Sequence, residues 1–63
     1  MKPTYLIRLE FTNRTPIMMY SYKEDFCSAR EGAILIKETS NAKSVEIWKA
    51  VSLELVARIE SKH

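Results

Sequence analysis

The segment from Ser21 to Asn41, SYKEDFCSAREGAILIKETSN, has the pattern of one amphipathic helix and decides how the rest of the chain is interpreted. At 100° per residue, its apolar side chains fall within a stripe about 80° wide, and glutamates line the opposite side. The apolar stripe consists of Tyr22, Phe26, Ala29, Ala33 and Ile36. A helix with one apolar face must bury that face, so we expect the remaining segments to cover it.

Both ends of this helix have sequence signals. Ser21 followed by Glu24 fits a capping box, in which the hydroxyl and the carboxylate each accept a hydrogen bond from an early backbone N–H. Lys37 near the other end has the charge that the helix dipole favours, and Asn41 tolerates the left-handed conformation that ends many helices. We therefore predict a helix from Ser21 to about Asn41.

Two strands are predicted before the helix. From Thr4 to Phe11 every odd position is apolar and most even positions are polar, which is the pattern of a half-buried strand. Residues 12–16, TNRTP, predict a turn. The segment from Ile17 to Tyr20, IMMY, is apolar on both faces, so we expect it either to lie deep in the fold or to be shielded by a partner.

The segment after the helix also alternates. Seven of the eight odd positions from Val45 to Ile59 are apolar, against three of the seven even ones. Because about 15 residues exceed the usual length of one strand, we predict a hairpin from strands 44–50 and 53–60, turning near Val51 and Ser52. A second helix is the alternative, because Val45, Trp48, Ser52, Leu55 and Ile59 approximate a heptad seam.

The expected fold is a single α+β domain over residues 1–63, with element order β-β-α-β-β. An antiparallel sheet carries the helix on one face, which gives a two-layer sandwich. Odd residues of the first, third and fourth strands should face the helix, and even residues should face away. A chain of this length supplies only roughly 3 to 5 kcal/mol from its own core, so we expect association with itself or with another protein.

The sequence lacks the residues that several kinds of catalysis and ligand binding require. One cysteine, Cys27, excludes an internal disulfide, and the only histidine, His63, is the last residue, so neither a metal nor another cofactor is expected. Cys27 has no nearby base, and no phosphate-binding glycine loop is present, so we do not expect an enzyme. Because the sequence has neither an apolar run of about 20 residues nor a secretory signal, we expect a cytoplasmic protein without membrane contact.

Nucleic acid is a possible but disfavoured partner. Exposed aromatic residues with Arg8 and Arg58 on an open sheet face could stack on single-stranded bases. The glutamates expected on the same face outnumber these arginines, however, and would repel a phosphate backbone. These glutamates are Glu10, Glu46, Glu54 and Glu60. In the loops, Arg14 and Lys43 are the remaining candidate anchors.

A protein interface fits the even-numbered sheet face better, because this face is apolar at its centre and charged at its rim. The expected centre is Trp48, Leu6 and Val56, with either Met18 and Tyr20 or Ile17 and Met19; the expected rim is Arg8, Arg58 and Glu46. Leu35, on a flank of the helix, is a second candidate contact. The alternative is that Trp48 only covers a small core.

We therefore expect a small non-enzymatic protein that docks on another protein or on its own copy. In size and element order the chain resembles the small inhibitors and antitoxins encoded by phages and other mobile elements, although no motif carries this resemblance. The resemblance implies steric blocking of a host protein. The alternatives are a nucleic-acid-binding accessory protein and a homodimer with a structural role.

Overall fold

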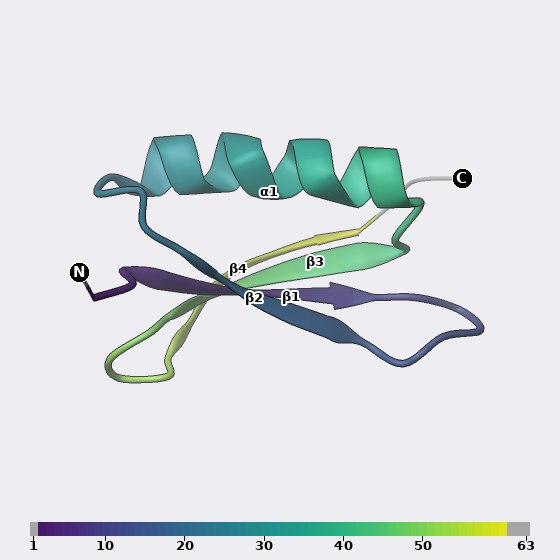
Figure 1. Cartoon of the computed structure of the whole chain (residues 1–63), viewed down its shortest axis with the longest axis horizontal. Helices are drawn as coiled ribbons and strands as arrows, with labels where there is room; N and C mark the ends of the chain where they lie inside the picture. The colour runs from purple at the N-terminus through teal and green to yellow at the C-terminus, as the bar shows by residue number, and fades with distance from the viewer. Residues whose placement is uncertain (1, 61–63) are drawn as a thin grey trace.

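The chain forms a four-stranded antiparallel sheet with one helix lying across one face (Figure 1). The computed structural model describes residues 2–60. Their elements are β1 (Tyr5–Glu10), β2 (Ile17–Ser21), α1 (Phe26–Ser40), β3 (Ser44–Lys49) and β4 (Leu55–Glu60), and the strand order is β2-β1-β3-β4. The predicted two-layer α+β fold is confirmed, and the segment after the helix is a hairpin rather than a second helix.

The centre of the sheet joins two hairpins. β1 pairs with β2 in the first hairpin, and β3 pairs with β4 in the second. The two hairpins meet where β1 runs antiparallel to β3, with Ile7 opposite Ile47 and Leu9 opposite Val45. As a result β2 and β4 are the two edges of the sheet.

The predicted alternation holds in the two central strands. Val45 and Ile47 are fully buried, and Ile7 and Leu9 are almost so. These side chains face α1, which supplies Ala29 and Ala33 to the same layer. Small residues on the helix allow it to approach the sheet closely, and Phe26 completes one end by packing edge-on against Tyr5, with 6.1 Å between ring centroids.

β4 does not keep the predicted alternation over its whole length. Ile47 lies opposite Ala57, but Trp48 lies opposite Leu55, so Val56 is an extra residue in a β-bulge. Leu55 was expected to face the helix because its number is odd; instead it lies beside Trp48 and is 48% exposed. Of β4, only Ala57 and Ile59 pack against the core.

The helix begins later than predicted. Ser21 is the last residue of β2, opposite Tyr5, and its carbonyl oxygen accepts a hydrogen bond of 2.9 Å from the N–H of Thr4. The N-cap is Asp25, whose Oδ2 accepts from the N–H of Ser28 at 2.9 Å. Strand pairing therefore overrides the expected capping box, and Tyr22 lies before the helix, exposed, rather than on the apolar stripe.

The end of the helix agrees with the prediction. Asn41 has φ 60° and ψ 34°, the left-handed conformation. The chain reverses here because the N–H of Asn41 donates to Glu38 O and the N–H of Ala42 donates to Lys37 O. Ala42 is buried at the start of the return to the sheet.

Candidate functional site

An apolar row crosses the outer face of the sheet, which is the face turned away from α1. The row contains one side chain from each strand: Tyr20, Leu6, Trp48 and Leu55. Leu6 lies opposite Tyr20 on one side and opposite Trp48 on the other, and Trp48 lies opposite Leu55. Because neighbouring strands are about 4.8 Å apart, the row spans roughly 15 Å.

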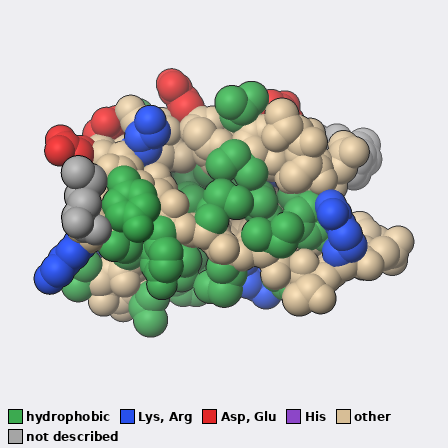
Figure 2. All heavy atoms as spheres, in the orientation of Figure 1, with side chains coloured by type: hydrophobic (Ala, Val, Ile, Leu, Met, Phe, Trp, Pro, Cys, Tyr) green, Lys and Arg blue, Asp and Glu red, His purple; other side chains and the backbone are tan. Residues whose placement is uncertain are grey.

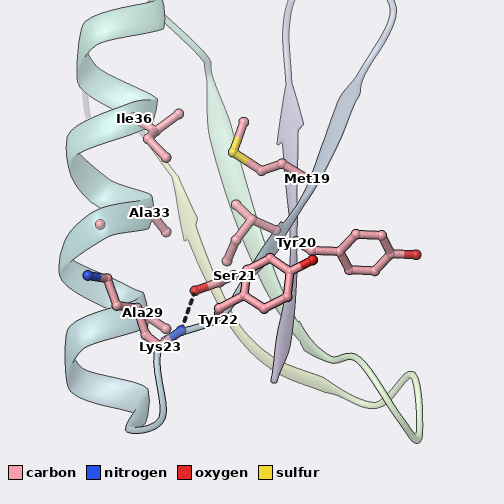
Figure 3. A pocket seen from close by; sticks show the side chains of 10 residues that line it. Met19, Tyr20, Ser21, Tyr22, Lys23, Ala29, Ala33 and Ile36 are labelled. Carbon is pink, nitrogen blue, oxygen red and sulfur yellow. Dashed lines mark hydrogen bonds between the residues drawn. The ribbon is translucent and has the colours of Figure 1, made fainter. Parts of the chain in front are cut away.

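The ends of the apolar row are open to solvent. Tyr20 is 60% exposed and Leu55 48%, whereas Leu6 and Trp48 between them are half-buried. Met18 and Val56 are also exposed beside the row. Of the two alternatives for β2, the structure therefore places Met18 and Tyr20 on the outer face, and Figure 3 shows Met19 turned toward the helix and Tyr20 turned away from it.

A charged row runs next to the apolar row. Arg8, Glu46 and Arg58 lie opposite one another on β1, β3 and β4. Arg58 Nη1 is 2.7 Å from one carboxylate oxygen of Glu46, and Arg8 Nη1 is 3.3 Å from the other. Glu46 is buried, and an arginine contacts each of its two carboxylate oxygens.

Two further glutamates complete this network. Glu10 contacts Arg8 at 3.0 Å and Arg58 at 3.1 Å, and Glu60 contacts Nε of Arg58 at 2.9 Å. The hydrogen bond from Arg58 holds the pKa of Glu10 below its usual value, and the hydrogen bonds to Glu60, Glu46 and Glu10 raise the pKa of Arg58. The five residues have a net charge of −1, counting two arginines against three glutamates.

The expected rim residues are therefore together, but they flank the apolar row on one side instead of surrounding it. Arg8 and Arg58 each already pair with Glu46. Leu35 does not join this surface, because it lies on α1 in the other layer, where it is 62% exposed.

The two candidate nucleic-acid anchors lie outside the strands, Arg14 between β1 and β2 and Lys43 between α1 and β3. Arg14 Nη2 donates to the carbonyl oxygen of Ser40 at 3.2 Å, and its guanidinium lies 4.1 Å from the centroid of the Phe11 ring. This arginine therefore ties the first hairpin to the end of α1. Lys43 is exposed in the connection to β3, and its backbone N–H donates to Glu10 O.

Within residues 2–60 no group of three or more His, Cys, Asp or Glu side chains could hold a metal ion. Cys27 is a free, exposed thiol, and His63 lies outside the described residues. No helix in the part of the chain that the structure describes is long and apolar enough to cross a membrane.

Sequence reasoning missed a groove between α1 and β2. The helix packs over β3 and β1, so the inner side of β2 is left partly uncovered. The space is about 390 Å³, and Ile7, Met19, Ala29, Gly32, Ala33 and Ile36 form its apolar lining (Figure 3). Two sequence features could have indicated this groove: Gly32 in the helix and β2, which is apolar on both faces. Neither feature shows over which strands the helix lies.

Comparisons with models of protein families, with curated proteins and with solved structures gave no significant match for this chain.

Proposed function

We propose that this protein is a non-enzymatic module that docks on another protein through the outer face of its sheet. Blocking is the mechanism we favour, as in the small inhibitors and antitoxins of phages and other mobile elements. Trp48 is the central anchor of the proposed interface, and Leu6, Val56, Met18 and Tyr20 surround it. We further propose that it acts in the cytoplasm, where the free thiol of Cys27 would stay reduced.

The observation that supports this proposal is the apolar row itself. A tryptophan at its centre lies between Leu6 and Leu55, and Tyr20 ends the row at the sheet edge. Aromatic side chains near the centre of an apolar patch are the commonest hot spots of protein interfaces. A partner that covered the row would bury apolar surface without having to break the neighbouring ion pairs.

Charge argues against nucleic acid as the partner. Aromatic residues on an open sheet could stack on bases, but the charged row beside them is net negative. Most non-specific affinity for nucleic acid comes from neutralising phosphates, which this face does not do.

The experiment is affinity capture from a host lysate with the wild type and with Trp48→Ala. Its matched control is Leu35→Ala, which removes an apolar side chain that is 62% exposed on α1, in the layer opposite the row. We expect the same protein to be retained by the wild type and Leu35→Ala. Trp48→Ala should weaken its binding by about 2 kcal/mol or more.

Circular dichroism of the three proteins must accompany the capture. Equal retention by a folded Trp48→Ala would contradict the proposed interface. Retention that disappears after nuclease treatment or at moderate ionic strength would instead support a nucleic-acid partner.

A further inference from the structure

The two edges of the sheet differ in how they are protected against pairing. The β4 edge has a bulge at Val56 and carries Arg58 and Glu60. Bulges and charged residues are features by which natural proteins prevent an edge strand from pairing with another chain. The β2 edge, Ile17–Ser21, has no charged residue, no proline and an unbroken register with β1. Pro16 precedes it and limits pairing only at its start. β2 is therefore the edge that is open to another strand.

The surface beside β2 is also apolar. Figure 1 views the molecule from the β2 side, and Figure 2 shows hydrophobic side chains gathered across the middle of that view. Four large side chains on or next to β2 are exposed: Ile17 (44%), Met18 (58%), Tyr20 (60%) and Tyr22 (53%). On the helix side of β2, the groove described above leaves further apolar surface uncovered.

We propose that β2 is the pairing edge of a homodimer, in which the β2 strand of a second copy adds antiparallel to it. The two four-stranded sheets then form one continuous sheet of eight strands with both helices on the same face. This inference does not depend on the proposed docking of another protein on the outer face.

The sequence of β2 fits a copy of itself in one register. With Met19 opposite its own copy, Met18 lies opposite Tyr20 and Ile17 opposite Ser21, so all five residues of the strand are paired. Residues of the same parity face one another, so the groove-facing side chains of both copies fall on the helix side. The pairs on the outer face are methionine with tyrosine, which are favourable cross-strand neighbours.

Charge around the strand is compatible with this pairing. Antiparallel strands bring the start of one β2 beside the end of the other. Arg14 precedes the strand, whereas Lys23, Glu24 and Asp25 follow it and have a net charge of −1. The positive start of one β2 strand therefore lies beside the weakly negative end of the other. Within the paired residues 17–21 no like charges lie opposite each other.

The available area is sufficient for a dimer. An aromatic side chain buries about 150–250 Å² when fully covered, so the four half-exposed residues offer on the order of 400 Å². With the groove walls and the strand backbone, each copy would bury roughly 600 Å², which corresponds to the lower limit of a stable interface, about 1,200 Å² in total. This area is enough for a specific dimer, and its affinity is set by the quality of the contacts and not by area alone.

Sedimentation over a range of concentrations tests the dimer. Two variants target the interface without disturbing the core. Ile17→Lys places a charge on the edge, and Gly32→Lys fills the groove from a position where a Cβ meets no atom within 4 Å apart from the neighbouring helix backbone. Each should raise the dissociation constant at least about tenfold, because an edge lysine or a filled groove opposes strand addition.

The matched control is Leu35→Lys, which adds the same charge at an exposed helix position away from the groove. It should dimerise like the wild type, and so should a folded Trp48→Ala. A wild type that stays monomeric up to millimolar concentration would overturn the proposal. So would a dimer that survives Ile17→Lys but is lost in Trp48→Ala, because that dimer would use the outer face.

A cysteine scan tests the register. In a Cys27→Ser background, Met19→Cys should form a disulfide-linked dimer under mild oxidation, since each cysteine lies opposite its own copy. Ile17→Cys is the control and should not cross-link, because residue 17 lies opposite residue 21. Cross-linking through residue 17 in preference to residue 19 would refute this arrangement.

Discussion

Arg58 on β4 and Glu10 on β1 form an ion pair, with 3.1 Å between Nη1 and Oε1, although β3 lies between their strands. The same Nη1 contacts Glu46 on β3 at 2.7 Å. One guanidinium therefore links three strands of the outer face, and it joins the N-terminal hairpin to the C-terminal one.

The first prediction concerns the carboxyl of Glu10. In Arg58→Gln, its pKa should rise towards the ordinary value, because the hydrogen bond from Arg58 is the main cause of the lowered pKa. An NMR titration of the carboxyl groups measures this change. Arg30→Gln removes an exposed arginine from α1 instead and should leave the pKa of Glu10 as it is. An equal change in both variants would contradict the assignment.

The second prediction concerns acid stability and the helix cap. The pKa of Asp25 is lowered mainly by the hydrogen bond from the N–H of Ser28. A carboxyl with a lowered folded-state pKa stabilises the fold above its unfolded-state pKa, about 4, and this contribution is lost as the pH falls through the lower folded-state value. Glu10 acts in the same direction. The melting temperature should therefore drop as the pH falls below about 4.

Asp25→Asn separates the charge of the cap from its geometry. Asparagine can still accept the hydrogen bond, but it does not titrate. The variant should therefore lose part of the dependence of melting temperature on pH in the acid range. A pH profile identical to that of the wild type would show that the charge of Asp25 contributes nothing.

The third prediction is that Gly32→Ala stabilises the monomer. Gly32 lies inside α1, and a Cβ built there meets no atom within 4 Å apart from the neighbouring helix backbone. Replacing a helix-interior glycine by alanine should therefore raise the free energy of unfolding by about 0.5–1 kcal/mol. Chemical denaturation measures the free energy of unfolding. The variant and the wild type should be compared at a concentration where both are monomeric. A loss of stability would mean that the groove is narrower than described.

The fourth prediction concerns the turn between β3 and β4. Leu53 has φ 59°, a left-handed conformation that costs an ordinary residue roughly 1–2 kcal/mol. Its side chain is 61% exposed, so little packing is lost when it is replaced. Leu53→Asn should raise the free energy of unfolding by about 0.5–1 kcal/mol, because asparagine tolerates this conformation.

Val51→Asn is the control for that change. Val51 is 90% exposed in the same turn and does not have a positive φ. We expect its effect on the free energy of unfolding to stay within about 0.5 kcal/mol. A similar gain in both variants would show that polarity, and not backbone conformation, is responsible.

Local patterns were sufficient to predict the element order and the two central strands. Alternation in β1 and β3 identified Ile7, Leu9, Val45 and Ile47 as core residues, and Asn41 marked the end of the helix. The start of the helix was wrong because Ser21 is held by long-range pairing with the N-terminal strand. A capping signal within one segment contains no information about that contact.

The candidate site was predictable only in part. Alternation placed Trp48 and Leu6 on the outer face, but the bulge at Val56 has no glycine to reveal it, so Leu55 was assigned to the wrong face. The register between neighbouring strands decides which charged side chains lie opposite one another. Arg8, Glu46 and Arg58 are opposite one another only because of how three strands align, and the groove beside β2 depends on where the helix crosses the sheet.

The strand order has a consequence for how the chain folds. The central contact, Ile7 with Ile47, joins residues 40 positions apart, so the middle of the sheet forms only after a long loop closes. Each hairpin alone is two-stranded and marginally stable in water. We therefore expect folding in one cooperative step whose transition state already holds both halves of the chain together, and neither half should persist as a folded fragment.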